Sequence, residues 1–230
     1  MRNNCVDDFE FIWSDNWCIA DDKAWFVTGE QDILFCLDRK TKNTILAKEI
    51  PERNNSFRLH PKCIKYGEMI FCLPDMGENI WCYNIVADMW AKIKVNNPQR
   101  VRIACTNAWF VQGKLYVVSI GLKQILELNL QKEIIYYSLP IRDEGKVSGS
   151  ILIDQQIYLV GVYPAVIYKF NCLTKKIDII RLPDIRDSIH TIVYDGKKFW
   201  MTGYRRRIYV WEEKINNILI LDKLPDEFGI

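Results

Sequence analysis

Histidine is scarce in this sequence, and the usual marks of a metal, nucleic-acid or membrane protein are missing. The 230 residues include only two histidines, and no cysteines are spaced as C-x-x-C, so we expect no metal site. Lysine and arginine total 31 against 29 acidic residues, a formal net charge of +2. This balance gives no electrostatic reason to expect a nucleic acid or an anionic membrane as partner. No run of 18 apolar residues is present, so a membrane helix is not expected.

The N-terminal segment also lacks the apolar stretch of a secretion signal, because Asp7, Asp8 and Glu10 interrupt it. Most of the eight cysteines fall inside apolar runs, where a reduced thiol packs as a small hydrophobic side chain. A chain of this length does not need covalent staples. We therefore expect free, packed thiols and a cytoplasmic location, with a disulfide framework as the alternative.

What the sequence does contain is a repeat. Hydrophobic residues make up 49% and aromatic residues 13%, which favours strands. Five segments share a pattern of two apolar residues, a variable one, a large apolar one, and then an acid or amide. They are Leu34–Asp38, Ile80–Asn84, Ile125–Asn129, Ile167–Asn171 and Ile208–Glu212. Their starts are separated by 46, 45, 42 and 41 residues, so the repeat extends over nearly the whole chain.

Each copy is accompanied by three further short apolar runs, two before it and one after it. Turn residues separate the runs: Gly67, Gly113 and Gly196 suit tight hairpins, and Asp38 and Asn171 suit turns closed by the side chain. Each unit ends on an apolar residue followed by proline, except the second. The second unit instead ends as Val-Asn-Asn-Pro over residues 95–98. No window keeps the apolar spacing of a helix.

Four short antiparallel strands in each unit are typical of a β-propeller blade. We therefore expect an all-β fold, a β-propeller built from five four-stranded blade repeats, either a closed five-bladed ring or a partial propeller. It would form one domain over residues 1–230, with blades at about 16–55, 56–98, 99–140, 141–183 and 184–225. A β-sandwich is the alternative, but it does not explain the fourfold order within each unit.

The run Asp195–Gly203, followed by Ile208, resembles the D-G-x-h-W-F-T run of streptogramin-lyase-like propellers. The five units together resemble kelch-like and streptogramin-lyase-like propellers. This resemblance implies that the loop entering the first strand of a blade and the loop between its second and third strands open on one face. The motif describes a blade, so no catalytic residue is carried over from it.

Aromatic, arginine and histidine side chains gather in those loops, which favours a recognition surface. The candidate binding residues are Trp13, Arg58, His60, Arg102, Tyr163, His190, Tyr204 and Arg205. No set of nucleophile, base and orienting group accompanies them. The leading hypothesis is a non-enzymatic scaffold that binds a protein, peptide or glycan without a cofactor.

Two alternatives remain. The first is a metal-assisted lyase or hydrolase, with His60 or His190 as acid or base and Glu30, Asp75 or Glu78 as partner or metal ligand. The second is a partial ring that works only within a larger assembly, which would make the chain an oligomer.

The binding hypothesis predicts that different residues determine the stability of the fold and the binding of a ligand. The loop residues, His60 included, are expected to face solvent, so their replacement should leave stability nearly unchanged. Phe170 and Trp211 are expected in the core. Four lysines lie on the hairpin turns at the outer side of the blades, and their replacement is expected to leave binding unchanged, so they serve as silent controls: Lys40, Lys42, Lys175 and Lys176.

Overall fold

A computed structural model describes residues 17–29, 31–52, 58–129, 131, 133–141, 145–163, 165–182, 185, 187–204 and 207–221. These residues form five four-stranded antiparallel sheets, and in each sheet the four strands are neighbours in sequence order. Each sheet is a blade, so the prediction of a five-bladed all-β propeller fold is confirmed. The chain divides into two compact units, residues 1–105 and 106–230, which are described one at a time.

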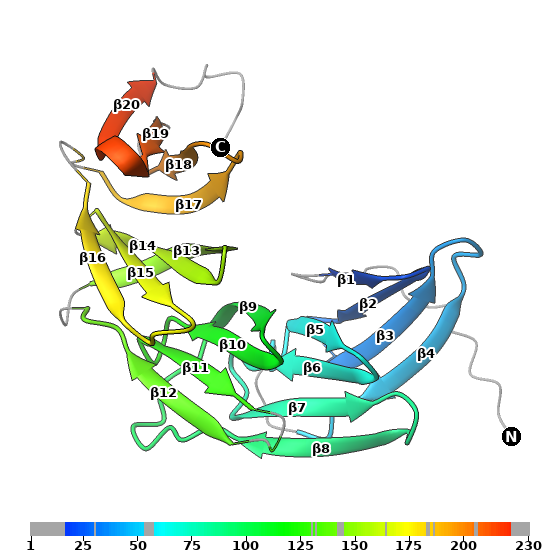
Figure 1. Cartoon of the computed structure of the whole chain (residues 1–230). Coiled ribbons are helices and arrows are strands. Elements are labelled where there is room, and N and C mark those ends of the chain that lie inside the picture. The colour runs from blue at the N-terminus through cyan, green and yellow to red at the C-terminus, as the bar shows by residue number, and fades with distance from the viewer. Residues whose placement is uncertain are drawn as a thin grey trace, which may run out of the picture. The chain divides into compact units, whose positions relative to one another are not determined.

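The first unit holds two blades, whose strands run from blue to cyan in Figure 1. The first blade consists of β1 (Trp17–Ala20), β2 (Lys23–Val27), β3 (Ile33–Asp38) and β4 (Thr44–Glu49). The second consists of β5 (Lys62–Tyr66), β6 (Met69–Leu73), β7 (Asn79–Asn84) and β8 (Met89–Lys94).

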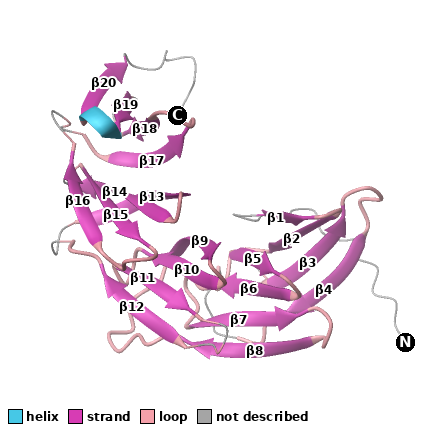
Figure 2. Cartoon of the chain, in the orientation of Figure 1, coloured by secondary structure: helices cyan, strands magenta, loops and turns pink. Residues whose placement is uncertain are grey.

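The second unit holds the other three blades, beginning with β9 at the boundary between the units. The third blade consists of β9 (Cys105–Val111), β10 (Lys114–Ser119), β11 (Gln124–Leu128) and β12 (Ile134–Ser138). The fourth consists of β13 (Lys146–Ile153), β14 (Gln156–Tyr163), β15 (Val166–Asn171) and β16 (Ile177–Arg181). The fifth consists of β17 (Ile189–Tyr194), β18 (Phe199–Gly203), β19 (Ile208–Glu212) and β20 (Asn217–Leu221). One short 3-10 turn, η1 (Glu213–Ile215), is the only helical element among the described residues (Figure 2).

The middle strands of the first four blades are buried along most of their length, which explains why they read as continuous apolar runs. In the fifth blade, β18 alternates buried and exposed residues, and Trp200 is partly exposed. In β6, four of the five residues are buried, whereas β4 at the edge of its blade is mostly exposed. Within the first unit, Trp25 and Cys36 of one blade pack with Ile70 and Cys72 of the next. Burial between neighbouring blades therefore supplies the core.

The turns follow the predicted chemistry. Oδ1 of Asp38 accepts the backbone N–H groups of Lys40 and Thr41, both at 2.8 Å, and Asn171 does the same for the residues that follow it. Gly67 has a φ of +54°, a conformation that glycine adopts without steric cost.

The seven described cysteines are all free and six of them are buried, as predicted; Cys5 lies outside the described residues. Within the described part of the chain, no helix is long and apolar enough to cross a membrane.

Charged side chains also link neighbouring blades. In the second unit, the buried carboxylate of Glu127 accepts hydrogen bonds from Lys114, Tyr137 and Lys175. Lys175 comes from the fourth blade and Glu127 from the third, and the lysine also lies over the ring of Tyr116. The expectation that Lys175 is a silent control is therefore wrong, because its ammonium neutralises a buried charge.

Candidate functional site

Three of the predicted loop residues come together around the loop between β6 and β7. Arg102 donates to both oxygens of Asp75, from Nε at 2.7 Å and from Nη2 at 2.6 Å. Nε of Arg58 lies 3.5 Å from the same carboxylate. Because Asp75 is buried, its two cationic neighbours compensate a charge that would otherwise be costly. Hydrogen bonding to Asp75 in turn raises the pKa of Arg102.

Backbone hydrogen bonds fix this loop on both sides. The N–H of Asp75 donates to the carbonyl of Leu59 at 2.8 Å, and the N–H of Ala104 donates to the carbonyl of Asp75 at 3.1 Å. Three segments far apart in sequence are thereby joined: the residues before β5, the β6–β7 loop, and the connection from β8 to β9. The side chains on this surface are consequently carried by a rigid frame.

His60 occupies the interior of the same region. Its side chain is 0% exposed, with Nδ1 3.0 Å from Oδ2 of Asp32 and Nε2 2.9 Å from the carbonyl oxygen of Asn79. The expectation that His60 faces solvent is wrong, because both ring nitrogens are engaged inside the protein. His60 therefore lies in the interior beneath the surface loops and helps to hold them in position.

Glu52 completes this buried cluster. Its carboxylate accepts the N–H of Glu78 at 2.5 Å, the side-chain amide of Asn79 at 2.8 Å and the indole N–H of Trp81 at 3.0 Å. Burial alone would raise the pKa of Glu52, but these hydrogen bonds outweigh it and lower the pKa. Oε2 also lies 3.8 Å from Nε2 of His60. The sequence pattern did not indicate Glu52.

Gly77 is required by the close approach of His60 to the β6–β7 loop. A Cβ atom at position 77 would lie 2.8 Å from both Cε1 and Nε2 of the imidazole and 2.9 Å from the carbonyl oxygen of Leu59. Only glycine leaves room for the ring beneath the loop.

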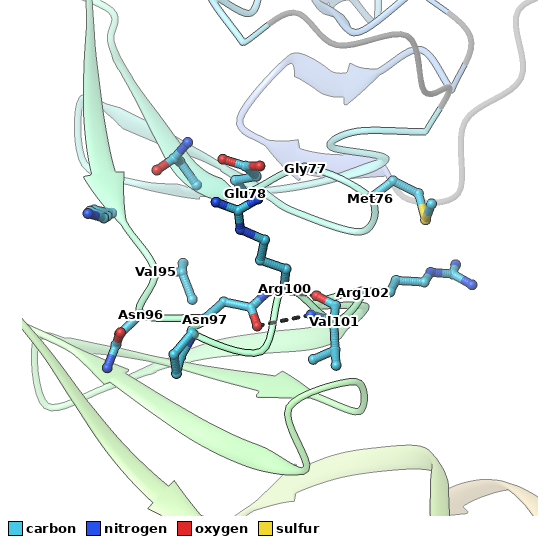
Figure 3. Close-up of a pocket in the computed structure, with 12 residues that line it drawn as sticks. Met76, Gly77, Glu78, Val95, Asn96, Asn97, Arg100, Val101 and Arg102 are labelled. Carbon is cyan, nitrogen blue, oxygen red and sulfur yellow. Dashed lines mark hydrogen bonds between the residues drawn. The ribbon is translucent and has the colours of Figure 1, made fainter.

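Above this frame the surface is hollowed into a pocket of about 530 Å³ (Figure 3). This volume is within the usual range of small-molecule binding sites. The β6–β7 loop, the β8–β9 connection and the adjoining ends of β7 and β8 supply its lining: Met76, Gly77, Glu78, Asn79, Lys94, Val95, Asn96, Asn97, Pro98, Arg100, Val101 and Arg102.

Arg100 extends from its own small loop toward Glu78, in the middle of the pocket (Figure 3). The side chain of Asn97 closes that loop, because its Nδ2 donates to the carbonyl of Val101 at 2.6 Å and its Oδ1 accepts the N–H of Val101 at 3.2 Å. The N–H of Arg100 donates to the carbonyl of Asn97 at 3.1 Å. Arg100 itself has a φ of +51°, and this clamp maintains the left-handed conformation.

The other predicted residues lie elsewhere or are not described. In the second unit, the rings of His190 and Tyr204 are 6.1 Å apart, and both side chains are exposed. Tyr163 is the last residue of β14. Trp13 and Arg205 lie outside the described residues, as does Glu30 of the alternative hypothesis.

Sequence reasoning missed Arg100 and Lys94 as candidate site residues. One signal was present: the second unit departs from the apolar–proline ending of the others. Val95 is buried like the apolar residue that ends the other units, and the irregular residues that follow it build the arginine-bearing loop.

No group of three or more histidine, cysteine, aspartate or glutamate side chains among the described residues is arranged to hold a metal ion. The side chains that converge at the pocket are instead cationic, anionic and amide groups. Such groups are suited to binding through charge and hydrogen bonds.

Comparison with solved structures finds the same fold. The crystal structure of virginiamycin B lyase from Staphylococcus aureus superposes with a TM-score of 0.71 at 12% identity, over 91% of this chain and 69% of that chain. A streptogramin B lyase structure gives 0.71 at 15% identity, over 91% and 68%. A chain of the mitotic checkpoint complex gives 0.68 at 8% identity, over 96% and 66%.

No protein-family model matches the sequence, and no curated protein matches it. The structural similarity therefore supports a propeller fold of the kind found in streptogramin B lyases, while the kelch resemblance stays a prediction. At these identities the likeness concerns the fold alone.

Proposed function

We propose that residues 1–230 form one β-propeller domain that acts as a non-enzymatic binding module in the cytoplasm. Its recognition site is the pocket between the β6–β7 loop and the β8–β9 connection, and its ligand is a peptide segment of a protein partner. One observation carries the proposal: the clamped loop that presents Arg100 in the middle of a pocket of about 530 Å³.

A peptide suits this pocket better than a glycan does. Its described lining combines charged and amide side chains with exposed apolar ones and contains no aromatic ring on which a sugar could stack. Met76 and Val101 are 42% and 38% exposed at its edge, so they offer contact area to an apolar side chain.

The burial of His60 argues against a lyase or hydrolase that uses this histidine as acid or base. An acid or base must reach its substrate, whereas His60 is fully buried with both ring nitrogens engaged. Asp75, its suggested partner, is held by Arg102. The structural match to two lyases supports the fold and supplies no catalytic residue.

A peptide selection tests this function. The purified chain is immobilised and a phage library of random 12-residue peptides is selected on it, in parallel with two variants. Val101→Trp fills the pocket from a partly exposed position, whereas Lys40→Gln alters an exposed turn elsewhere in the same unit. We expect peptides that bind the wild type and Lys40→Gln but not Val101→Trp. Failure to enrich any peptide, or equal binding to Val101→Trp, would overturn the proposal.

A further inference from the structure

The pocket is more positive than the chain as a whole. Lys94, Arg100 and Arg102 line it together with a single acidic side chain, Glu78. The whole chain carries a formal net charge of only +2. Cationic side chains therefore outnumber acidic ones in this lining, so the pocket attracts an anion.

The cations in the lining are not equivalent. The guanidinium group of Arg102 is already bound within the protein, because both oxygens of Asp75 accept its hydrogen bonds. Arg100 and Lys94, by contrast, form no ion pair with any described residue, and both are exposed. Arg100 therefore has its hydrogen-bond donors available for a ligand.

Exposed arginines usually move freely, and ordering them costs conformational entropy. Here the clamp from Asn97 to Val101 orders the backbone that carries Arg100 before any ligand arrives. Bidentate binding of a carboxylate by a guanidinium then needs less ordering of the chain.

We infer that the pocket selects a peptide that carries one carboxylate, an Asp or Glu side chain, next to an apolar residue; this inference rests on the proposed function. The carboxylate binds Arg100, with Lys94 adding to the local positive potential. The apolar neighbour lies against Met76 and Val101.

Glu78 determines which anion is preferred. Its carboxylate lies on the same side of the pocket as the Arg100 side chain (Figure 3). A phosphate group carries up to two negative charges, so Glu78 repels it more strongly than a monoanionic carboxylate, and this repulsion offsets the stronger attraction of the phosphate to Arg100 and Lys94. Glu78 therefore favours an acidic peptide over a phosphorylated one.

The first test repeats the phage selection on Arg100→Gln, with wild type and Lys40→Gln in parallel. Peptides selected on the wild type and on Lys40→Gln should be enriched in Asp or Glu beside an apolar residue, and this enrichment should disappear on Arg100→Gln. Peptides enriched on the wild type without acidic residues, or an acidic enrichment that persists on Arg100→Gln, would overturn the inference and leave the proposed function standing. No enrichment on any protein would overturn both.

The second test uses the most enriched peptide, labelled with fluorescein, in a polarisation assay. Replacing its acidic residue by the matching amide should weaken binding about 10- to 100-fold, the effect of a hydrogen-bonded charge. Replacing it by phosphoserine should not tighten binding to the wild type, but should tighten binding to Glu78→Gln. Tighter binding of the phosphoserine peptide to the wild type, or an unchanged affinity of the amide peptide, would contradict the inference.

Discussion

Asp32 binds His60 twice. Its Oδ1 accepts the backbone N–H of His60 at 2.9 Å, and its Oδ2 lies 3.0 Å from Nδ1 of the ring. Asp32 belongs to the first blade and His60 lies at the entrance to the second, so this pair ties two blades of one unit together. The same histidine supports the loop that borders the pocket.

Replacing His60 by alanine should therefore destabilise the fold, unlike the exposed His190. We expect the free energy of unfolding to fall by about 2 to 4 kcal/mol, because a buried cavity forms and Asp32 loses a partner. His190→Ala should change it by no more than about 0.5 kcal/mol. Urea unfolding followed by tryptophan fluorescence measures both, and equal small effects would argue against a structural role for His60.

Gly77 and His60 should show strong coupling. Gly77→Ala should destabilise the wild type, because the added methyl group would meet the imidazole at 2.8 Å. In the His60→Ala background part of this penalty should vanish, because the ring is gone. A double-mutant cycle from urea midpoints measures the coupling, and strictly additive effects would contradict the packing described.

The free energy of unfolding at acidic pH should depend on Glu127. Burial alone would raise its pKa, but hydrogen bonds from Lys114, Lys175 and Tyr137 lower it to about 2. Since the folded-state pKa is below that of the unfolded chain, the stabilisation is complete above about pH 4.5 and is lost as the pH falls toward 2.

Glu127→Gln should consequently reduce the free energy of unfolding at pH 7, on the order of 2 kcal/mol. The difference from the wild type should shrink between pH 4.5 and pH 2.5. Unfolding curves at a series of pH values check this, with Glu133→Gln on an exposed turn of the same blade as the control. A difference that stays constant over this range would show that the charge of Glu127 does not matter.

The thiols should be reduced but protected. Burial raises the pKa of Cys172 to about 11 and that of Cys63 further still, so little thiolate forms at neutral pH. Without reductant, the denatured chain should release colour from a thiol reagent for all eight cysteines, whereas most should react slowly in the native protein. Stoichiometry well below eight after denaturation would indicate disulfides.

The strands could be predicted from sequence because burial between blades leaves a direct pattern. All twenty described strands overlap apolar runs of the repeat, although some strands, such as β13, begin several residues earlier, and the turn at Asp38 follows from a side chain that bonds its own neighbours. These are local properties, since the residues involved are close together in the chain.

The candidate site could be predicted only in part. Arg58 and Arg102 were expected on one surface and share Asp75, but the sequence does not show which groups surround His60. The partners of His60 come from positions 28 and 19 residues away. Arg100 was missed because its loop repeats no pattern and depends on one side-chain clamp, from Asn97 to Val101.

Hydrogen–deuterium exchange with and without the peptide selected on the wild type tests the central claim most directly. The account predicts that the peptide slows amide exchange in residues 76–79 and 95–102, which line the pocket, and that Arg100→Gln abolishes this effect. The exposed turn at residues 39–42 should exchange equally in both states. Protection confined to that turn, with residues 76–79 and 95–102 unchanged, would contradict the assignment of the binding site.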